Sequence, residues 1–489
     1  TLLFCGGMRL LIRVLYHRGF YGNKRQRTVD WKNRRKQKPI IIIGAGEVGY
    51  HIAKKLSDEK RDVVLIDKDP AKVRRISENL DIQALLGSGT SPKMLREAGI
   101  EKAELLAAAT DSDEVNLIAC LLARSLNRHI VKIARVRNQE YVQESSLFSE
   151  DLLGVDLIIN TRDMMVKTIL SLMDIPGASE VIDFLGGEVK LVSFLISEDS
   201  PLAGMKLSNL KSSGEGLLIV AIVRGHKILI PSGADTIWPL DLIYLVVKKD
   251  NVHATLNRLG MSTRPLKNVI IVGAGATGMA VAHALDDRRH NVRLIDEDGD
   301  RCKQAATLLN YVTVIKGDAA DGDLLREANA GEMDLLIALT GDEESNVLIS
   351  LLAKEMGTRR TITRVSKLSY MHIVSAIGLD TVINPRMSAV RAILQHLRRG
   401  KILSVTPLRE EQAEAIEAEA LETSDIVNVP LAQVDFPPGA ILGAIVREGE
   451  IIIPKGDTIV LPHDRLIIFA LQQVLNSIER LLTVKLEYF

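Results

Sequence analysis

The sequence predicts an α/β protein with two doubly wound Rossmann-type parallel sheets, each followed by a small α+β domain. Three observations lead to this prediction. A glycine-rich turn at Gly44–Gly49 follows an apolar run and returns at Gly273–Gly278. Around both turns, apolar runs alternate with helical patterns of about ten to fifteen residues, as in the βαβ units of a parallel sheet. After each such unit, residues 187–250 and 424–470 change to short β-branched runs separated by turn residues.

The first unit contains six apolar runs whose continuity is typical of buried parallel strands. We expect strands at Ile40–Ile43, Val63–Ile66, Gln83–Leu86, Leu105–Ala109, Ile130–Ala134 and Asp156–Ile159. The second unit repeats the landmarks of the first. Gly44 and Asp67 return 229 residues later as Gly273 and Asp296, and Asn116 returns as Asn346.

The segments after the two units also repeat each other. Arg224–Pro231 and the Asp-Thr-Ile at 235–237 match Arg447–Pro454 and the Asp-Thr-Ile at 457–459. The acidic stretch Arg409–Leu421 is expected to be a solvated helical linker. The predicted organisation is a basic N-terminal extension (1–38), a first Rossmann domain (39–160), a linker helix (161–186), a first small domain (187–258), a second Rossmann domain (266–385), linker helices (386–423) and a second small domain (424–483).

Composition indicates a soluble globular protein, with 46% hydrophobic and 25% charged residues in 489. Aromatic residues are only 4%, which disfavours stacking platforms for single-stranded nucleic acid. Residues 1–38 hold eleven Lys or Arg and one acid, which leaves 51 basic and 61 acidic residues in the remainder, a net charge of about −10. An acidic body argues against a nucleic-acid partner.

The N-terminal segment and the cysteines carry weaker signals. The basic segment is either an amphipathic arm on anionic lipid or an extension ahead of the folded body, and we favour the extension. No run of eighteen apolar residues occurs, so no membrane-spanning helix is expected. The three cysteines, Cys5, Cys120 and Cys302, form no metal-ligand spacing, so we expect a reducing compartment, no metal site and, for Cys120, an inert core thiol.

The glycine turns predict a bound nucleotide because each lies in a strand, GxGxxG, helix, strand, acid sequence. The first glycine permits a tight turn, the second lets a pyrophosphate approach the backbone, and the third lets the helix pack closely. The phosphates would then lie on the free N–H groups of the helix N-terminus. An empty, degenerate Rossmann unit is the alternative, and it is less plausible for two copies than for one.

The acid at the end of each second strand predicts the ligand class. Asp67 and Asp296 lie where a carboxylate would accept hydrogen bonds from the ribose hydroxyls and repel a 2′-phosphate, which favours NAD(H) or plain adenosine nucleotides over NADP(H). Lys68 and Asp69, then Arg74 and Arg75, follow the first acid, whereas Glu297 and Asp298 follow the second. We therefore expect the first pocket to tolerate an extra phosphate and the second to reject anions more strongly.

Further candidates lie at the carboxyl ends of later strands, where ligands bind in open α/β sheets. Thr110 and Thr340 follow the fourth strands, where Asp111 and Asp342 are equally well explained as helix caps. Arg135 and Arg364 end the fifth strands, where they would reach a phosphate or form an ion pair at a domain contact. The loops at Gly87–Thr90 and Gly317–Ala320 lie near the expected adenine. The predicted cofactor-binding residues are Gly44, Ala45, Gly46, Glu47, Val48, Gly49, Asp67, Thr110, Arg135, Gly273, Ala274, Gly275, Ala276, Thr277, Gly278, Asp296, Thr340 and Arg364.

No catalytic residue is predicted. A dehydrogenase needs a proton donor beside the nicotinamide, and no histidine recurs between the two copies at a position facing the expected cleft. A Walker A sequence and a GxSxG are absent as well. A duplicated binding site without a catalytic pair favours a sensor over an enzyme.

These motifs resemble the TrkA family, the NAD-binding regulatory subunits of Trk potassium-uptake systems. The resemblance covers residues 39 to about 483 and depends on the order of parts: a KTN/RCK-type nucleotide domain, a small regulatory domain, then both again. Ala109–Asn116 and the Arg-x₆-Pro and Asp-Thr-Ile closure of each small domain match as well. Ser88 departs from the family, which often has Asp or Asn there, and this weakens the expected adenine contact of the first site.

The resemblance implies binding of NAD(H) and, in some members, of ATP or ADP. It implies a ring of four such chains on the cytoplasmic face of a membrane potassium channel or transporter, gated by nucleotide. Two rival functions remain: an NAD-dependent oxidoreductase, and a regulator of another cation channel or antiporter.

Overall fold

The computed structural model describes residues 38–149, 152–210, 217–225, 227–261, 264–367, 370, 374, 377–397, 402–408 and 412–482. The chain divides after Asn160 into two compact units, which are described separately. The expected N-terminal extension lies outside the described residues except for Lys38. Within the described part of the chain, no helix is both long enough and apolar enough to cross a bilayer.

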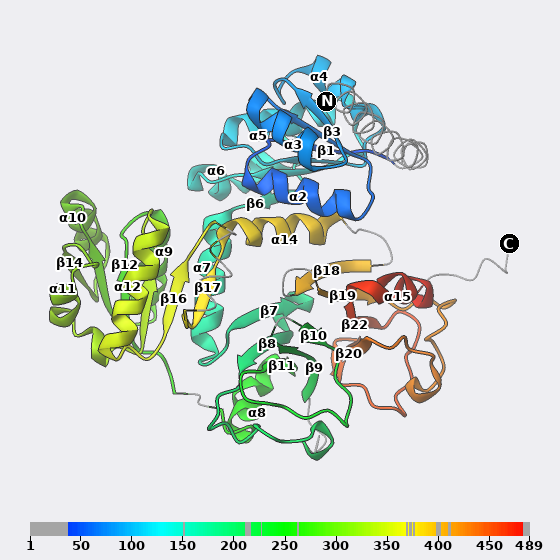
Figure 1. Cartoon of the computed structure of the whole chain (residues 1–489). Helices are drawn as coiled ribbons and strands as arrows, with labels where there is room; N and C mark the ends of the chain where they lie inside the picture. Colours follow the sequence, from blue (N-terminus) through cyan, green and yellow to red (C-terminus); the bar gives the residue numbers. More distant parts are fainter. Residues whose placement is uncertain are drawn as a thin grey trace, which may run out of the picture. The chain divides into compact units, whose positions relative to one another are not determined.

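The first unit is a six-stranded parallel sheet of order β3-β2-β1-β4-β5-β6, drawn in blue to cyan in Figure 1. Its strands are β1 (Ile40–Ile43), β2 (Val63–Asp67), β3 (Gln83–Leu86), β4 (Leu105–Ala108), β5 (Val131–Arg135) and β6 (Leu157–Ile159). Its helices are α2 (Glu47–Asp58), α3 (Pro70–Asn79), α4 (Pro92–Glu97), α5 (Asp113–Leu126) and α6 (Gln139–Gln143). All four isoleucines of β1 are buried, as a central strand covered on both faces requires.

The second unit contains the same parallel sheet again, in the order β14-β13-β12-β15-β16-β17. Its strands are β12 (Asn268–Val272), β13 (Asn291–Asp296), β14 (Val312–Lys316), β15 (Leu335–Ala338), β16 (Thr361–Arg364) and β17 (Thr381–Ile383). Its helices include α9 (Ala276–Asp287), α10 (Gly299–Leu308), α11 (Gly322–Glu327) and α12 (Glu343–Met356). The predicted fold class, two doubly wound parallel sheets, is confirmed.

Two five-stranded antiparallel sheets make up the rest of the second unit. The first has the order β10-β9-β11-β8-β7 and the second has the matching order β21-β20-β22-β19-β18. Their strands are β7 (Glu180–Phe184), β8 (Val189–Leu195), β9 (Leu217–Arg224), β10 (Lys227–Leu229), β11 (Leu242–Lys248), β18 (Ile402–Leu408), β19 (Ala413–Glu419), β20 (Ala440–Arg447), β21 (Glu450–Ile452) and β22 (Arg465–Leu471). The helices α7 (Thr161–Asp174), α8 (Val252–Arg258), α14 (Pro385–Leu397) and α15 (Leu475–Leu482) belong to the same unit.

Two expected helical linkers are partly wrong. The helix α7 ends at Asp174, and β7 occupies much of the remainder of the segment expected to be helical up to 186. The acidic stretch expected to be a helix contains β19, which lies between β18 and β22. Six of its seven residues are buried, and Glu417 forms an ion pair with Arg465. Pairing on both edges outweighs the helix propensity of alternating Ala and Glu.

Each small sheet contains the same ion pair between an arginine at the surface and a buried aspartate. Arg224 donates from Nε and Nη2 to the two carboxylate oxygens of Asp241, at 2.8 and 2.7 Å. Arg447 and Asp464 repeat this arrangement at 2.9 and 2.7 Å. The repeated arginine that the sequence marks in each small domain therefore closes the loop before the last strand of its sheet.

Candidate functional site

Both glycine turns have the backbone geometry that the sequence predicts. Gly44 and Gly273 have φ of +103°, in the left-handed region that favours glycine. A Cβ on Gly49 would lie 1.8 Å from the carbonyl oxygen of Gly44, and Gly278 repeats this distance to Gly273. The first and third glycines are therefore required by the turn itself.

The second glycine of each turn is different, because nothing in the chain requires it. Gly46 and Gly275 have ordinary extended backbone angles and cap their helices without a side-chain hydrogen bond. A Cβ added to either would meet no atom within 4 Å. The open space beside a helix N-terminus, with its free N–H groups, fits a phosphate group.

Asp67 and Asp296 lie beside the glycine turns, as expected, and also brace them. The Asp67 carboxylate accepts hydrogen bonds from the backbone N–H of Ala45 at 2.5 Å and of Asp69 at 2.8 Å. Asp296 accepts from Ala274 at 2.6 Å and from Asp298 at 2.8 Å. Each carboxylate oxygen has a second acceptor position, which a ribose hydroxyl could fill.

Thr110 and Thr340 end their strands beside the glycine turns and are each bound to a buried asparagine. A Cβ on Gly44 would lie 3.1 Å from the Thr110 backbone. The Thr110 hydroxyl donates to Asn116 Oδ1 at 2.7 Å, and Asn116 Nδ2 donates to the Arg135 carbonyl at 2.8 Å.

Asn346 makes the same contacts to Thr340, at 2.7 Å, and to Arg364, at 3.2 Å. These asparagines position the carboxyl ends of two neighbouring strands, a role that was not predicted from the sequence. The sequence signal for this role was that both asparagines occur at matching positions of the two copies.

Arg135 and Arg364 lie at that same edge of each sheet. Arg135 donates from Nη1 to Asp111 at 3.2 Å, within its own unit, and Asp111 is largely exposed. The Nε atoms of both arginines are buried and have no hydrogen-bond partner within the described part of the chain. Burial lowers the pKa of both guanidinium groups, so each favours an anionic partner.

The expected caps after the fourth strands are half right. Asp342 caps α12 by accepting from Ser345 N at 2.7 Å. In the first copy the cap of α5 is Ser112, which accepts from Val115 N, whereas Asp111 pairs with Arg135. Ser112 and Asp342 occupy the same position, two residues after the threonine, and Asp111 corresponds to Gly341.

The charges near the two ribose positions differ from the expected contrast between a first pocket of mixed charge and an acidic second pocket. In the second copy, Arg301 Nη1 lies 3.8 Å from Asp296 Oδ2, so the pocket expected to be acidic also contains a cation. In the first copy, Arg74 pairs with Glu78 on its own helix at 2.8 Å.

The two loops expected near the adenine are each closed by a local hydrogen bond. In loop 87–90 the hydroxyls of Ser88 and Thr90 lie 2.8 Å apart. In the second copy Asp318 accepts a hydrogen bond from Ala320 N at 2.8 Å.

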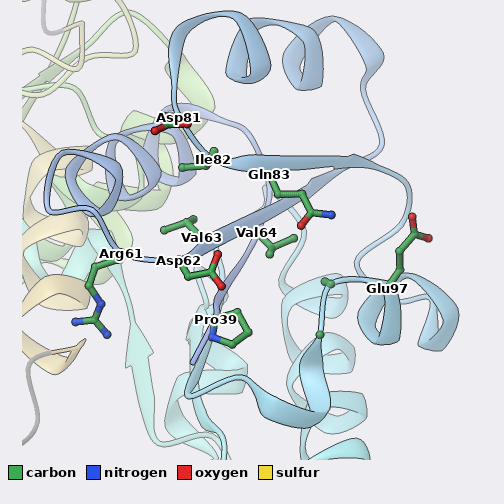
Figure 2. A pocket seen from close by; sticks show the side chains of 11 residues that line it. Pro39, Arg61, Asp62, Val63, Val64, Asp81, Ile82, Gln83 and Glu97 are labelled. Carbon is green, nitrogen blue, oxygen red and sulfur yellow. The ribbon is translucent and has the colours of Figure 1, made fainter. Parts of the chain in front are cut away.

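A surface hollow of about 200 Å³ lies elsewhere on the first unit (Figure 2). Pro39, Asp62 and Gln83 line it, and they lie at the starts of β1, β2 and β3. The glycine turn follows the other end of β1. The hollow therefore lies at the opposite edge of the sheet from the nucleotide candidate.

The fold and the twin turns define a class: tandem Rossmann-type nucleotide domains, each followed by a small antiparallel sheet. The TrkA-N domain model matches residues 40–161 and 269–385, and the TrkA-C domain model matches residues 191–260 and 415–483. The chain belongs to the TrkA family.

Curated relatives and solved structures agree with this assignment. The chain is 36% identical to the Trk system potassium uptake protein TrkA of Azorhizobium caulinodans, over 92% of this chain and 100% of that protein. It is 34% identical to the protein of the same name from Halomonas elongata, with the same coverage. The crystal structure of the GsuK RCK domain matches with a TM-score of 0.59 at 19% identity, covering 91% of this chain and 95% of that chain, which shows the shared fold.

Proposed function

We propose that this chain is a nucleotide-sensing regulatory subunit of a Trk-type potassium uptake channel or transporter, located in the cytoplasm at the inner face of the membrane. One observation carries the proposal: an open glycine turn faced by a carboxylate occurs twice, in a chain whose relatives are named potassium uptake proteins. NAD(H) is the proposed ligand, with ATP or ADP as further ligands. A structure of the same fold is described as the GsuK channel bound to NAD.

In the proposed complex the pyrophosphate lies against the N-terminus of α2 or α9, at Gly46 or Gly275. The adenosine ribose lies at Asp67 or Asp296, where the carboxylate accepts from the hydroxyls and repels a 2′-phosphate. Thr110 with Arg135, and Thr340 with Arg364, border the ligand at the edge of the sheet. The buried Nε atoms and lowered guanidinium pKa values of the arginines support a role towards phosphate.

Regulation would follow from linkage in a homo-oligomeric ring, for which we propose a tetramer. A nucleotide that binds the open ring more tightly than the closed ring shifts the population by its differential affinity alone. Small differences in binding free energy at several sites would sum to the few kcal/mol needed to shift the channel between its open and closed states.

A sensor accounts for the sites better than an oxidoreductase does. A dehydrogenase built by duplication would be expected to repeat its proton donor, but His51 is matched by Ala280 and His283 by Lys54. Steady oxidation of NADH with any carbonyl or hydroxy-acid substrate would instead support the rival enzyme.

Ion flux in vesicles tests the proposal. Vesicles containing the membrane partner should change their potassium or rubidium flux when this chain and NADH, NAD⁺ or ATP are added together. Vesicles without the membrane partner should show no change. Equal flux with and without every nucleotide would overturn the regulatory assignment.

Ligand variation tests the ribose contact without altering the protein. NADPH should bind about tenfold or more weakly than NADH, because its 2′-phosphate meets Asp67 or Asp296. Equal affinity for the two dinucleotides in a calorimetric titration would contradict the proposed position of the ribose.

A further inference from the structure

Four side chains gather beside the first glycine turn. Glu47 is the first residue of α2 and directly follows Gly46. Its carboxylate lies 3.8 Å from Arg75 Nη1 and 3.7 Å from His51 Nε2. The Arg75 guanidinium also stacks over the Tyr50 ring, at 4.6 Å from its centre. The cluster therefore ties the start of α2 to the neighbouring helix α3.

The second turn lacks this cluster, although its backbone is the same. At the matching positions, 229 residues later, the sequence has Ala276, Met279, Ala280 and Gln304. Gly275 and Gly46 have nearly the same backbone angles, and both leave open space where a side chain would begin. The open space at Gly46 or Gly275, beside the helix N-terminus, is called the cradle below. The two candidate sites thus have the same cradle but different charges next to it.

The position of Glu47 decides what that charge does. A helix N-terminus attracts anions through its free N–H groups and its dipole. A carboxylate on the first helical residue satisfies part of that attraction and repels a ligand phosphate at the same place. Arg75 offsets part of this charge, because it reaches Glu47 from α3. Glu47 nevertheless places a negative charge on the residue next to Gly46.

We propose that Glu47 makes the first site selective for dinucleotides over nucleoside triphosphates, while the second site, with Ala276, binds both. A dinucleotide brings a bridging pyrophosphate with one charge on each phosphate. A triphosphate brings a terminal phosphate and about two further charges into the same cradle. This inference rests on the proposed nucleotide binding and assigns different ligand classes to its two sites.

Single-site proteins make the proposal testable in the full chain. A Gly275→Val substitution puts a side chain into the open space of the second cradle, so that only the first site remains. Gly46→Val isolates the second site in the same way. Calorimetric titrations of each protein with NADH and with ATP, without divalent cations, give the ratio of the two dissociation constants.

In the Gly275→Val protein, Glu47→Gln should lower the ATP-to-NADH ratio of dissociation constants about tenfold, since it removes the repulsion of the extra phosphate charges. In the Gly46→Val protein, Ala276→Glu should raise this ratio by a similar factor. Thermal melting of each variant checks that the fold is retained.

The outcomes separate this inference from the proposed function. If the Glu47→Gln and Ala276→Glu changes leave both ratios within twofold, or shift NADH and ATP affinity equally, Glu47 only stabilises its helix and the selectivity proposal is overturned. If neither single-site protein nor the unmodified chain binds any nucleotide, the proposed function fails as well.

Discussion

Asp67 and Asp296 each hold the glycine turn in place as well as lying at the proposed ribose position, and this limits how they can be tested by substitution. The sequence predicts Asp67 and Asp296 as ribose ligands. The structure adds that each carboxylate already accepts the backbone N–H after the first glycine. Replacement by alanine would therefore loosen the turn as well as remove the ligand contact. A loss of affinity in such a variant is informative only beside a ligand comparison such as NADH against NADPH.

The Arg447–Asp464 pair gives a prediction about one residue. Arg447→Ala should lower the free energy of unfolding by about 3 kcal/mol, because Asp464, only 2% exposed, loses two charge-assisted hydrogen bonds. Arg74→Ala is the matched control, since its ion pair with Glu78 is fully exposed and should change the free energy of unfolding little. Urea unfolding of the two variants measures the difference, and equal losses would contradict a structural role for the Arg447–Asp464 pair.

The strand-to-helix turn is the element that the sequence predicted best, and its glycines differ in their roles. Gly49→Ala should destabilise the first unit by about 3 kcal/mol, since its Cβ would lie 1.8 Å from the Gly44 carbonyl oxygen. Gly46→Ala should leave stability unchanged or raise it by up to about 1 kcal/mol, because its backbone angles are ordinary and its surroundings are open.

Nucleotide affinity should respond differently from stability in this pair of variants. Gly46→Ala should weaken NADH binding at the first site, because the added methyl group takes ligand space. A Gly46→Ala protein that keeps full affinity at both sites would show that the phosphate does not approach this glycine. Denaturation and NADH titration on the same preparations give both quantities.

Other elements were harder to predict, for a physical reason. The β19 segment alternates alanine and glutamate, which locally favours a helix, yet it lies between two strands and its Glu417 pairs with Arg465. The strand β7 was missed although its pairing with β8 is local: the two strands form a hairpin joined by residues 185–188, where Gly186 and Gly187 were the available turn signal. Local propensity is a weak guide where strand pairing decides.

At the scale of the whole molecule, equivalent helices of the two Rossmann domains expose apolar side chains. Ile118 on α5 is 44% exposed, and its counterpart Leu348 on α12 is 50% exposed. Leu121, 39% exposed, lies three residues after Ile118 on the same helix, and we expect this apolar face to belong to a protein interface.

Ile118→Asp combined with Leu348→Asp should therefore lower the oligomer mass in light scattering while the melting temperature stays within a few degrees. Lys303→Asp with Arg74→Asp, at exposed charged positions, is the control and should leave the mass unchanged. A full-size assembly of the apolar-site variant would argue against these helices as ring contacts.

The sequence by itself determined the two parallel sheets, the order of the domains and the position of both glycine turns. These follow from local patterns: apolar strand length, glycine spacing and an acid at a fixed distance, all repeated along the chain. The repetition also identified the family, since each copy supports the assignment of the other.

Only the tertiary structure decided that Asn116 and Asn346 tie together the ends of two neighbouring strands, because this depends on residues brought together from separate segments. The same holds for the cation beside Asp296 and for the cluster around Glu47. Arg301 is on α10 and Arg75 is on α3, so the distances from these side chains to Asp296 and Glu47 are set by how each helix packs against the sheet.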